Sequence, residues 1–92
     1  MPLVARRALV HGHVQGVAFR HHTKTLARQI GLTGWVRNVP NGDVEAWVEG
    51  DERLVESFLA WLEKGPPSAR VTRVEVEFVA PAGHVQFKVR FD

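Results

Sequence analysis

The 92-residue sequence contains no cysteine. This absence excludes a disulfide framework, a zinc site built from thiolates and a cysteine nucleophile. No apolar run reaches the roughly 18 residues that a membrane-spanning helix needs, and the first residues lack the apolar core of a signal peptide. We therefore expect a soluble cytoplasmic protein that has no membrane partner.

Linkers, internal repeats and low-complexity segments are missing as well. A chain of this length buries roughly 60–65% of its unfolded surface, which suffices for one core. We therefore expect a single domain over residues 1–92 that works as a monomer. The formal net charge is only +2, which suits a small anionic ligand and gives weak support for binding nucleic acid.

Apolar residues recur with helical spacing in two segments and alternate with polar residues in the others. Gly31 and Gly65 predict the ends of the two helices, and Asp51 predicts the N-terminal cap of the second helix. Asn41-Gly42 predicts a tight hairpin turn between two strands. The predicted strands span 1–10, 33–39, 44–49, 74–78 and 85–91, and the predicted helices carry apolar faces formed by Phe19, Thr23, Leu26, Ala27 and Ile30 and by Leu54, Val55, Phe58, Leu59, Trp61 and Leu62.

The predicted order is β-α-β-β-α-β followed by a terminal strand. Two amphipathic helices on one face of a mainly antiparallel sheet form an α+β, ferredoxin-like, split βαβ sandwich. In this plan the strands 1–10 and 33–39 run parallel on either side of the strand 44–49, so both end at the same edge of the sheet. Asn38 therefore returns to the side of the sheet where the segment after the first strand begins, about two strand spacings, or roughly 10 Å, from that strand.

Residues 11–20 follow the first strand and lead into the first helix. Gly12 and Gly16 permit positive φ angles and the close approach of a ligand to peptide N–H groups. A turn that opens a helix offers an anion several unpaired N–H groups and the positive end of the helix dipole. Arg20 would add a planar guanidinium that can bond two phosphate oxygens at once. The segment predicts a phosphate site; the alternative is a tight turn beside a solvated Arg20.

Asn38 would complete such a site. Its amide carries a donor and an acceptor, so it could hold a water molecule beside a bound phosphate. These groups would suffice to hydrolyse an activated phosphate, because that chemistry depends mostly on positioning and on stabilising charge.

Two stretches of the sequence match known signatures. Residues 12–20, which read GHVQGVAFR, agree with the acylphosphatase signature G-x-V-Q-G-V-x-F-R at every fixed position. Residues 31–38, which read GLTGWVRN, resemble the second signature of that family, G-x-x-G-x-V-x-N. The likeness extends over the whole chain, including the Asn-Gly hairpin and the Gly-Pro-Pro loop. The chain therefore resembles the acylphosphatases.

The resemblance implies hydrolysis of the carboxyl–phosphate anhydride of acyl phosphates, which yields a carboxylate and inorganic phosphate. It implies that Arg20 binds the phosphoryl group, that Asn38 places the attacking water, and that a phosphate oxygen of the substrate takes the proton of the water. It implies no metal, no other cofactor and no covalent intermediate. The backbone amides that it assigns to the phosphate belong to His13, Val14, Gln15, Gly16, Val17, Ala18 and Phe19.

Three alternatives to this interpretation remain. Four histidines near the segment could ligate a metal ion, although solvated side chains are the simpler interpretation. An exposed Trp47 could stack on RNA bases, but four carboxylates assigned to the same face of the sheet would repel a phosphate backbone, so we expect no nucleic acid partner. A non-catalytic domain that binds carbamoyl phosphate within a larger enzyme is the third alternative. The histidines are His11, His13, His21 and His22, and the carboxylates are Glu45, Glu49, Glu75 and Glu77.

Overall fold

The computed structural model describes residues 2–92, so the predicted strand residue Met1 lies outside the described residues. The elements follow the predicted order β-α-β-β-α-β plus a final strand. They are β1 (Leu3–His13), α1 (Phe19–Gln29), β2 (Thr33–Asn38), β3 (Val44–Asp51), α2 (Glu52–Lys64), β4 (Arg70–Val79) and β5 (Phe87–Arg90).

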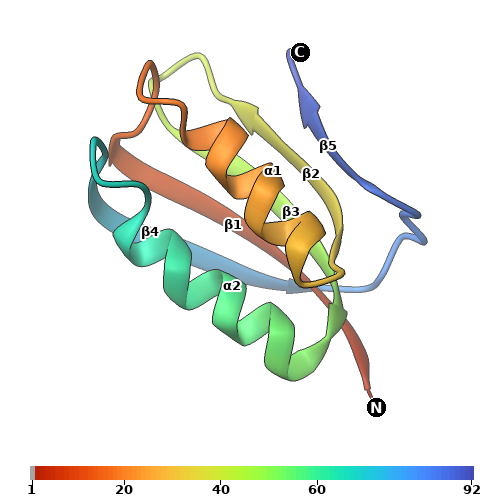
Figure 1. Ribbon diagram of the computed structural model, residues 1–92. Coiled ribbons are helices and arrows are strands. Elements are labelled where there is room, and N and C mark those ends of the chain that lie inside the picture. The colour runs from red at the N-terminus through yellow and green to blue at the C-terminus, as the bar shows by residue number, and fades with distance from the viewer. Residues whose placement is uncertain (1) are drawn as a thin grey trace.

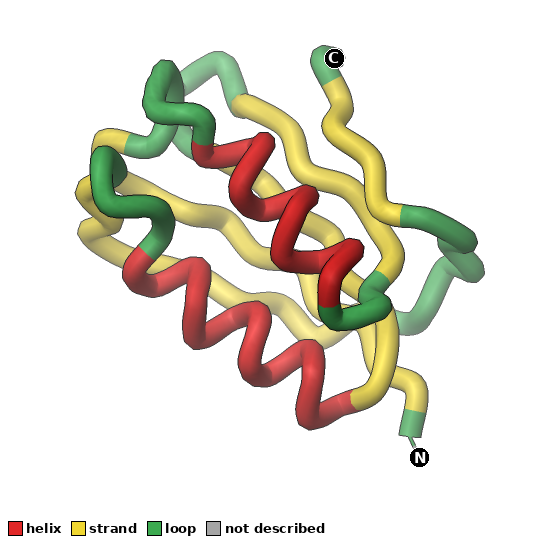
Figure 2. The backbone as a smooth tube through the Cα atoms, in the orientation of Figure 1, coloured by secondary structure: helices red, strands yellow, loops and turns green. Residues whose placement is uncertain are grey.

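The strands form one sheet in the order β4-β1-β3-β2-β5. β1 pairs antiparallel with β3 and β4, β2 pairs antiparallel with β3, and β2 pairs in parallel with β5. Both helices cover the same face of this sheet (Figure 1 and Figure 2): α1 packs on β2 and β5, and α2 packs on β1, β3 and β4. The structure confirms the ferredoxin-like α+β sandwich. Across residues 2–92, neither helix is long and apolar enough to cross a membrane.

The core lies between the helices and the sheet. Phe58 of α2 meets Phe87 of β5 there, with 6.0 Å between the ring centroids. Leu54 was predicted to share this core but is 39% exposed, because Val55, Phe58 and Leu62 already form the buried stripe of α2. The buried cluster consists of Ala8, Val10, Val14, Phe19, Ala27, Leu32, Val36, Val44, Ala46, Val48, Val55, Phe58, Leu62 and Phe87.

Two strands at the entrance to α1 are longer than predicted. β1 continues to His13, and β4 starts at Arg70. Their register shifts between His11 and Gly12. A Cβ on Gly12 would lie 2.1 Å from the carbonyl oxygen of Arg70, so this close approach requires glycine. An irregularity of this kind bends a strand, and here it does so just before the loop that leads into α1.

The final strand is shorter than predicted. β5 spans Phe87–Arg90, whereas Val85 and Phe91 are 88% and 83% exposed and lie outside it. The residues before β5 instead cross the face of the sheet that carries no helix. Their backbone there donates hydrogen bonds to Glu49.

The face of the sheet opposite the helices differs from its predicted character. Glu45 and Glu49 do project from this face, but they are buried rather than solvated, with 5% and 2% exposure. Glu45 forms ion pairs with Arg7 and Arg37. Glu49 accepts a hydrogen bond from Trp47 Nε1 at 2.7 Å. The four predicted surface carboxylates are therefore reduced to two, because partners from neighbouring strands neutralise Glu45 and donors surround Glu49.

Candidate active site

The loop between β1 and α1 adopts a left-handed backbone at two positions. Gly16 has a φ of 74° and Ala18 has a φ of 60°. Ala18 is the N-cap of α1 and makes no side-chain capping bond. An L-residue in the left-handed region is strained by about 1–2 kcal/mol, and such strain persists at functional sites where the surroundings enforce it. The two residues turn the chain sharply into the helix.

This curvature leaves a row of backbone donors unused. Across residues 2–92, no protein acceptor pairs with the N–H groups of residues 15–19. Arg20 lies in the first turn of α1, as predicted. The free N–H groups, the N-terminus of the helix and the guanidinium together form a positively polarised site. A site of this kind binds phosphate well.

Three contacts hold the loop in place. Phe19 is buried in the core and lies 5.7 Å from the ring of Trp61, measured between centroids. Ser68 Oγ donates to the carbonyl oxygen of Val17 at 3.3 Å. Thr23 Oγ1 donates to the carbonyl oxygen of Phe19 at 2.8 Å. The ring contact anchors the start of α1 in the core, and the two hydrogen bonds hold the carbonyl groups of Val17 and Phe19.

The side chain of Gln15 connects this loop to the hairpin between β2 and β3. Its Nε2 donates to the carbonyl oxygens of Val39 at 2.7 Å and of Asp43 at 2.8 Å. The sequence predicted a role only for the backbone of Gln15, because nothing in the residue spacing indicates which distant carbonyl groups its amide meets. Asn38 directly precedes Val39, so the loop and Asn38 are joined through Gln15.

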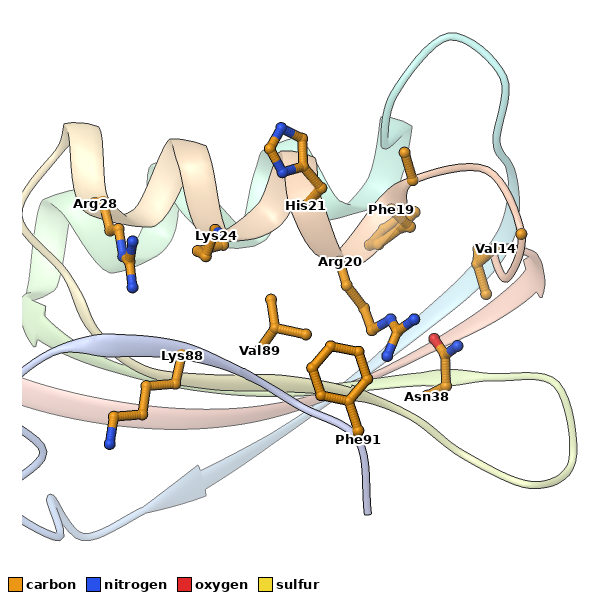
Figure 3. A pocket seen from close by; sticks show the side chains of 12 residues that line it. Val14, Phe19, Arg20, His21, Lys24, Arg28, Asn38, Lys88, Val89 and Phe91 are labelled. Atoms are coloured by element: carbon orange, nitrogen blue, oxygen red, sulfur yellow. The ribbon is translucent and has the colours of Figure 1, made fainter.

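Arg20 and Asn38 face a common cavity of about 540 Å³ (Figure 3). In the part of the chain that the structure describes, neither the guanidinium of Arg20 nor the amide of Asn38 has a protein hydrogen-bond partner. The ring of Phe91 lies 4.8 Å from the Arg20 guanidinium carbon, a cation–π contact that steadies the arginine. Both polar groups therefore remain available to a ligand, and the contact with Phe91 holds Arg20 in position.

The structure brings most of the predicted site residues to this cavity. Val14, Gly16, Ala18 and Phe19 line it together with Arg20 and Asn38. His13, Gln15 and Val17 do not line it, but the prediction concerned backbone N–H groups, and across residues 2–92 those of Gln15 and Val17 have no protein acceptor. His13 ends β1, the side chain of Gln15 points to the hairpin, and Val17 presents its carbonyl group to Ser68.

Sequence reasoning missed residues that line the cavity farther from the loop. They come from later turns of α1 and from the end of the chain. Helical spacing from Arg20 could have found the first two, because residues four and eight positions later lie on the same side of a helix. These residues are Lys24, Arg28, Lys88, Val89 and Phe91.

The histidines do not gather at one point. His11 Nδ1 lies 2.8 Å from Asp43 Oδ2, and its Nε2 is bonded to Glu75. This contact with His11 lowers the pKa of the Glu75 carboxyl below its ordinary value. His21 lines the cavity. Among residues 2–92, no three histidine or carboxylate side chains are arranged to hold a metal ion.

Comparisons with known proteins agree with this geometry. The family model of the acylphosphatases matches residues 6–89. An acylphosphatase of Thermococcus kodakarensis is 49% identical over 89 residues, which cover 97% of this chain and 98% of that protein. An acylphosphatase of Anaeromyxobacter dehalogenans is 51% identical over 89 residues, which cover 96% of this chain and 96% of that protein.

A solved structure shows the same similarity in three dimensions. The acylphosphatase from Coxiella burnetii superposes with a TM-score of 0.92 at 36% identity, covering 96% of this chain and 93% of that one. This likeness and the full-length relatives support the acyl-phosphate hydrolase among the interpretations of the sequence. The chain belongs to the acylphosphatase family and is a hydrolase of acyl phosphates.

Proposed function

We propose that the N–H groups of residues 15–19 and the guanidinium of Arg20 hold the phosphoryl group of the acyl phosphate, while Asn38 places the water that attacks it. One observation carries this proposal. Arg20 from α1 and Asn38 from β2 face the same cavity beside a row of unpaired backbone donors.

The phosphate is bound by complementary charge. An acyl phosphate carries its negative charge on the phosphoryl oxygens, which backbone N–H groups and the N-terminus of α1 attract. Arg20 adds a fixed positive charge whose two parallel N–H donors match two of these oxygens. Charge that develops on the phosphoryl group during the reaction is stabilised by donors already in place.

Asn38 acts on the water. Its amide oxygen can accept a hydrogen bond from the water, and its amide nitrogen can donate to a phosphoryl oxygen. The water oxygen forms a bond to phosphorus while the bond between phosphorus and the carboxyl oxygen breaks. The carboxylate leaves with the electron pair of that bond, and one proton of the water passes to a phosphoryl oxygen. The products are a carboxylate and inorganic phosphate.

Several features expected from the sequence remain proposals. This mechanism uses no metal ion, because Arg20 and the backbone donors meet the charge of the phosphoryl group.

We propose a monomer of one domain, since one chain supplies every residue named in the mechanism. Sedimentation analysis would test the monomer, and fractionation of cells would test the cytoplasmic location.

Arg20→Gln tests the phosphate assignment. We expect kcat/KM for an acyl phosphate to fall by about 10³-fold or more, in line with other arginines at phosphoryl transfer. Arg20→Lys should recover part of this loss, because lysine keeps the charge but not the two parallel donors.

Arg53→Gln is the matched control for this measurement. Arg53 is an exposed residue near the start of α2 and does not line the cavity. Its replacement removes the same charge and should leave kcat/KM within about twofold of wild type. If Arg20→Gln retained more than a tenth of the wild-type activity, the phosphate would have to bind elsewhere.

A further inference from the structure

The cavity beside Arg20 continues along α1, beyond the loop of residues 14–18 between β1 and α1, which we call the phosphate loop. Arg20, Lys24 and Arg28 all line it. Their spacing of four residues places them on one side of the helix, about 6 Å apart along its axis. Figure 3 shows the three side chains emerging from successive turns of α1 above β5.

This extended part of the cavity carries positive charge and no negative charge. No aspartate or glutamate lines the cavity, and α1 itself contains neither residue. A ligand in this region therefore meets cations on the helix side. Val89 and Phe91 of the opposite wall offer it apolar surface.

Lys24 of α1 and Lys88 of β5 both line the cavity. The side chain of Lys88 is exposed and points away from α1 (Figure 3), so Lys24 is the lysine that faces this region. Arg28 is held beside β5, because its Nε donates to the carbonyl oxygen of Phe87 at 3.0 Å, and it keeps its positive charge. Across residues 2–92, Lys24 forms no ion pair and no hydrogen bond through its side chain. It is partly buried, so an ion pair formed there is less screened than one on the open surface.

We propose that Lys24 makes the enzyme prefer acyl phosphates whose acyl part carries a carboxylate at the end remote from the phosphoryl group. The proposal rests on the placement of the reacting phosphoryl group at Arg20. With that group in the loop, the acyl part extends along α1, its hydrocarbon contacts Val89 and Phe91, and its distal charge reaches Lys24. The ammonium group of Lys24 pairs with that carboxylate.

The size of the preference follows from the kind of contact. A partly exposed pair of one lysine and one carboxylate is worth little more than a typical surface ion pair, which corresponds to a factor of up to about five. The preference should be largest at low ionic strength. It should shrink as salt screens the pair.

Two substrates that differ in one charge test the proposal. Benzoyl phosphate and 4-carboxybenzoyl phosphate share the phosphoryl group and the ring, and the rigid ring keeps the added carboxylate away from the reacting centre. We expect wild type to show a kcat/KM about fivefold higher for the carboxylated substrate at low ionic strength. Lys24→Gln should bring the ratio close to one, and Lys24→Glu should reverse it.

The controls separate this proposal from the proposed function. Arg53→Gln removes a positive charge away from the cavity and should leave the substrate ratio unchanged. The rate of each Lys24 variant on benzoyl phosphate shows that it is folded and active. Equal ratios in wild type and Lys24→Gln would overturn the role of Lys24 while leaving the phosphate site intact. An Arg20→Gln variant that retained more than a tenth of the wild-type activity on benzoyl phosphate would instead overturn the proposed function.

Discussion

The side chain of Gln15 links the loop between β1 and α1 to the hairpin that follows Asn38. Its amide nitrogen donates to the carbonyl oxygens of Val39 and Asp43, on either side of the turn that follows β2. These bonds set the position of Asn38 relative to the phosphate loop. We therefore propose that Gln15 is a positioning residue, which would act on the water through Asn38.

Gln15→Ala should lower kcat more than it weakens phosphate binding. Removal of the amide takes away the link between the loop and the hairpin, although each carbonyl oxygen keeps a bond from a backbone N–H of the hairpin. The hairpin can then move relative to the loop, and a displacement of about 1 Å can cost about 100-fold in rate. We expect kcat to fall by about ten- to a hundredfold, with a change of less than about threefold in the inhibition constant of inorganic phosphate.

Thr25→Ala provides the comparison for Gln15→Ala. It removes a side-chain hydrogen bond to the backbone, from Thr25 Oγ1 to the carbonyl oxygen of His21, on the exposed side of α1. This variant should keep the wild-type kcat. A Gln15→Ala enzyme with unchanged kcat would show that the hairpin holds Asn38 in place without help from the loop.

At the scale of the secondary-structure elements, β3 holds down the segment that leads into β5. The carboxylate of Glu49 accepts hydrogen bonds from the backbone N–H groups of Ala82 at 2.6 Å, Gly83 at 3.2 Å and His84 at 3.1 Å. This segment thereby covers part of the sheet face that no helix covers. Burial alone would raise the pKa of Glu49, but these bonds and one from Trp47 hold the pKa below its ordinary value of 4.5.

The sign of the pH dependence follows from this lowered pKa. A carboxyl group whose pKa is lower in the folded protein stabilises the fold above its unfolded pKa, and this stabilisation is lost as the pH falls through the folded value. Glu49→Gln should therefore lower the free energy of unfolding near pH 7 by about 1.5–3 kcal/mol, the range for hydrogen bonds to a charged group. It should also flatten the decline in stability below about pH 4.5. Denaturant unfolding at several pH values measures both effects.

Glu75→Gln is the control for Glu49→Gln. The pKa of Glu75 is also lowered, first by its hydrogen bond to His11, but its side chain is 55% exposed. Water compensates for the lost contact, so we expect a smaller loss of stability at pH 7. Curves of stability against pH that run parallel for wild type and Glu49→Gln would contradict the role assigned to Glu49.

The positions of the helices and strands could be predicted from the sequence, whereas the side-chain partners that neighbouring strands supply could not. Periodicity and turn residues locate both helices, and Asp51 caps α2 as expected, accepting from the N–H groups of Arg53 and Leu54. The burial of Glu45 depends on Arg7 and Arg37 in the strands on either side of β3. Alternation along β3 gives the face of a side chain but not the partners that neutralise it.

At the scale of the whole molecule, the topology brings the loop that precedes Arg20 and the end of β2 with Asn38 together. β1 and β2 lie on either side of β3 and run in the same direction. The loop after β1 and the end of β2 therefore meet at one edge of the sheet, which is why the position of Asn38 could be predicted. The extension of the cavity along α1 could not, because its other wall depends on how β5 and Phe91 pack beside that helix.

Asn38→Ala tests the central claim, that Asn38 acts on the water and the loop with Arg20 acts on the phosphate. An interaction made mainly in the transition state lowers kcat and kcat/KM together, whereas a contact shared with the ground state raises KM. The measurement is kcat on an acyl phosphate together with the inhibition constant of inorganic phosphate, with Arg20→Gln measured in parallel.

We expect Asn38→Ala to lower kcat by at least about 100-fold through misplacement of the water, while inorganic phosphate binds nearly as tightly as to wild type. Arg20→Gln should weaken phosphate binding as well as turnover. If phosphate affinity collapses in Asn38→Ala while kcat at saturation holds, Asn38 belongs to the phosphate site and another group must orient the water.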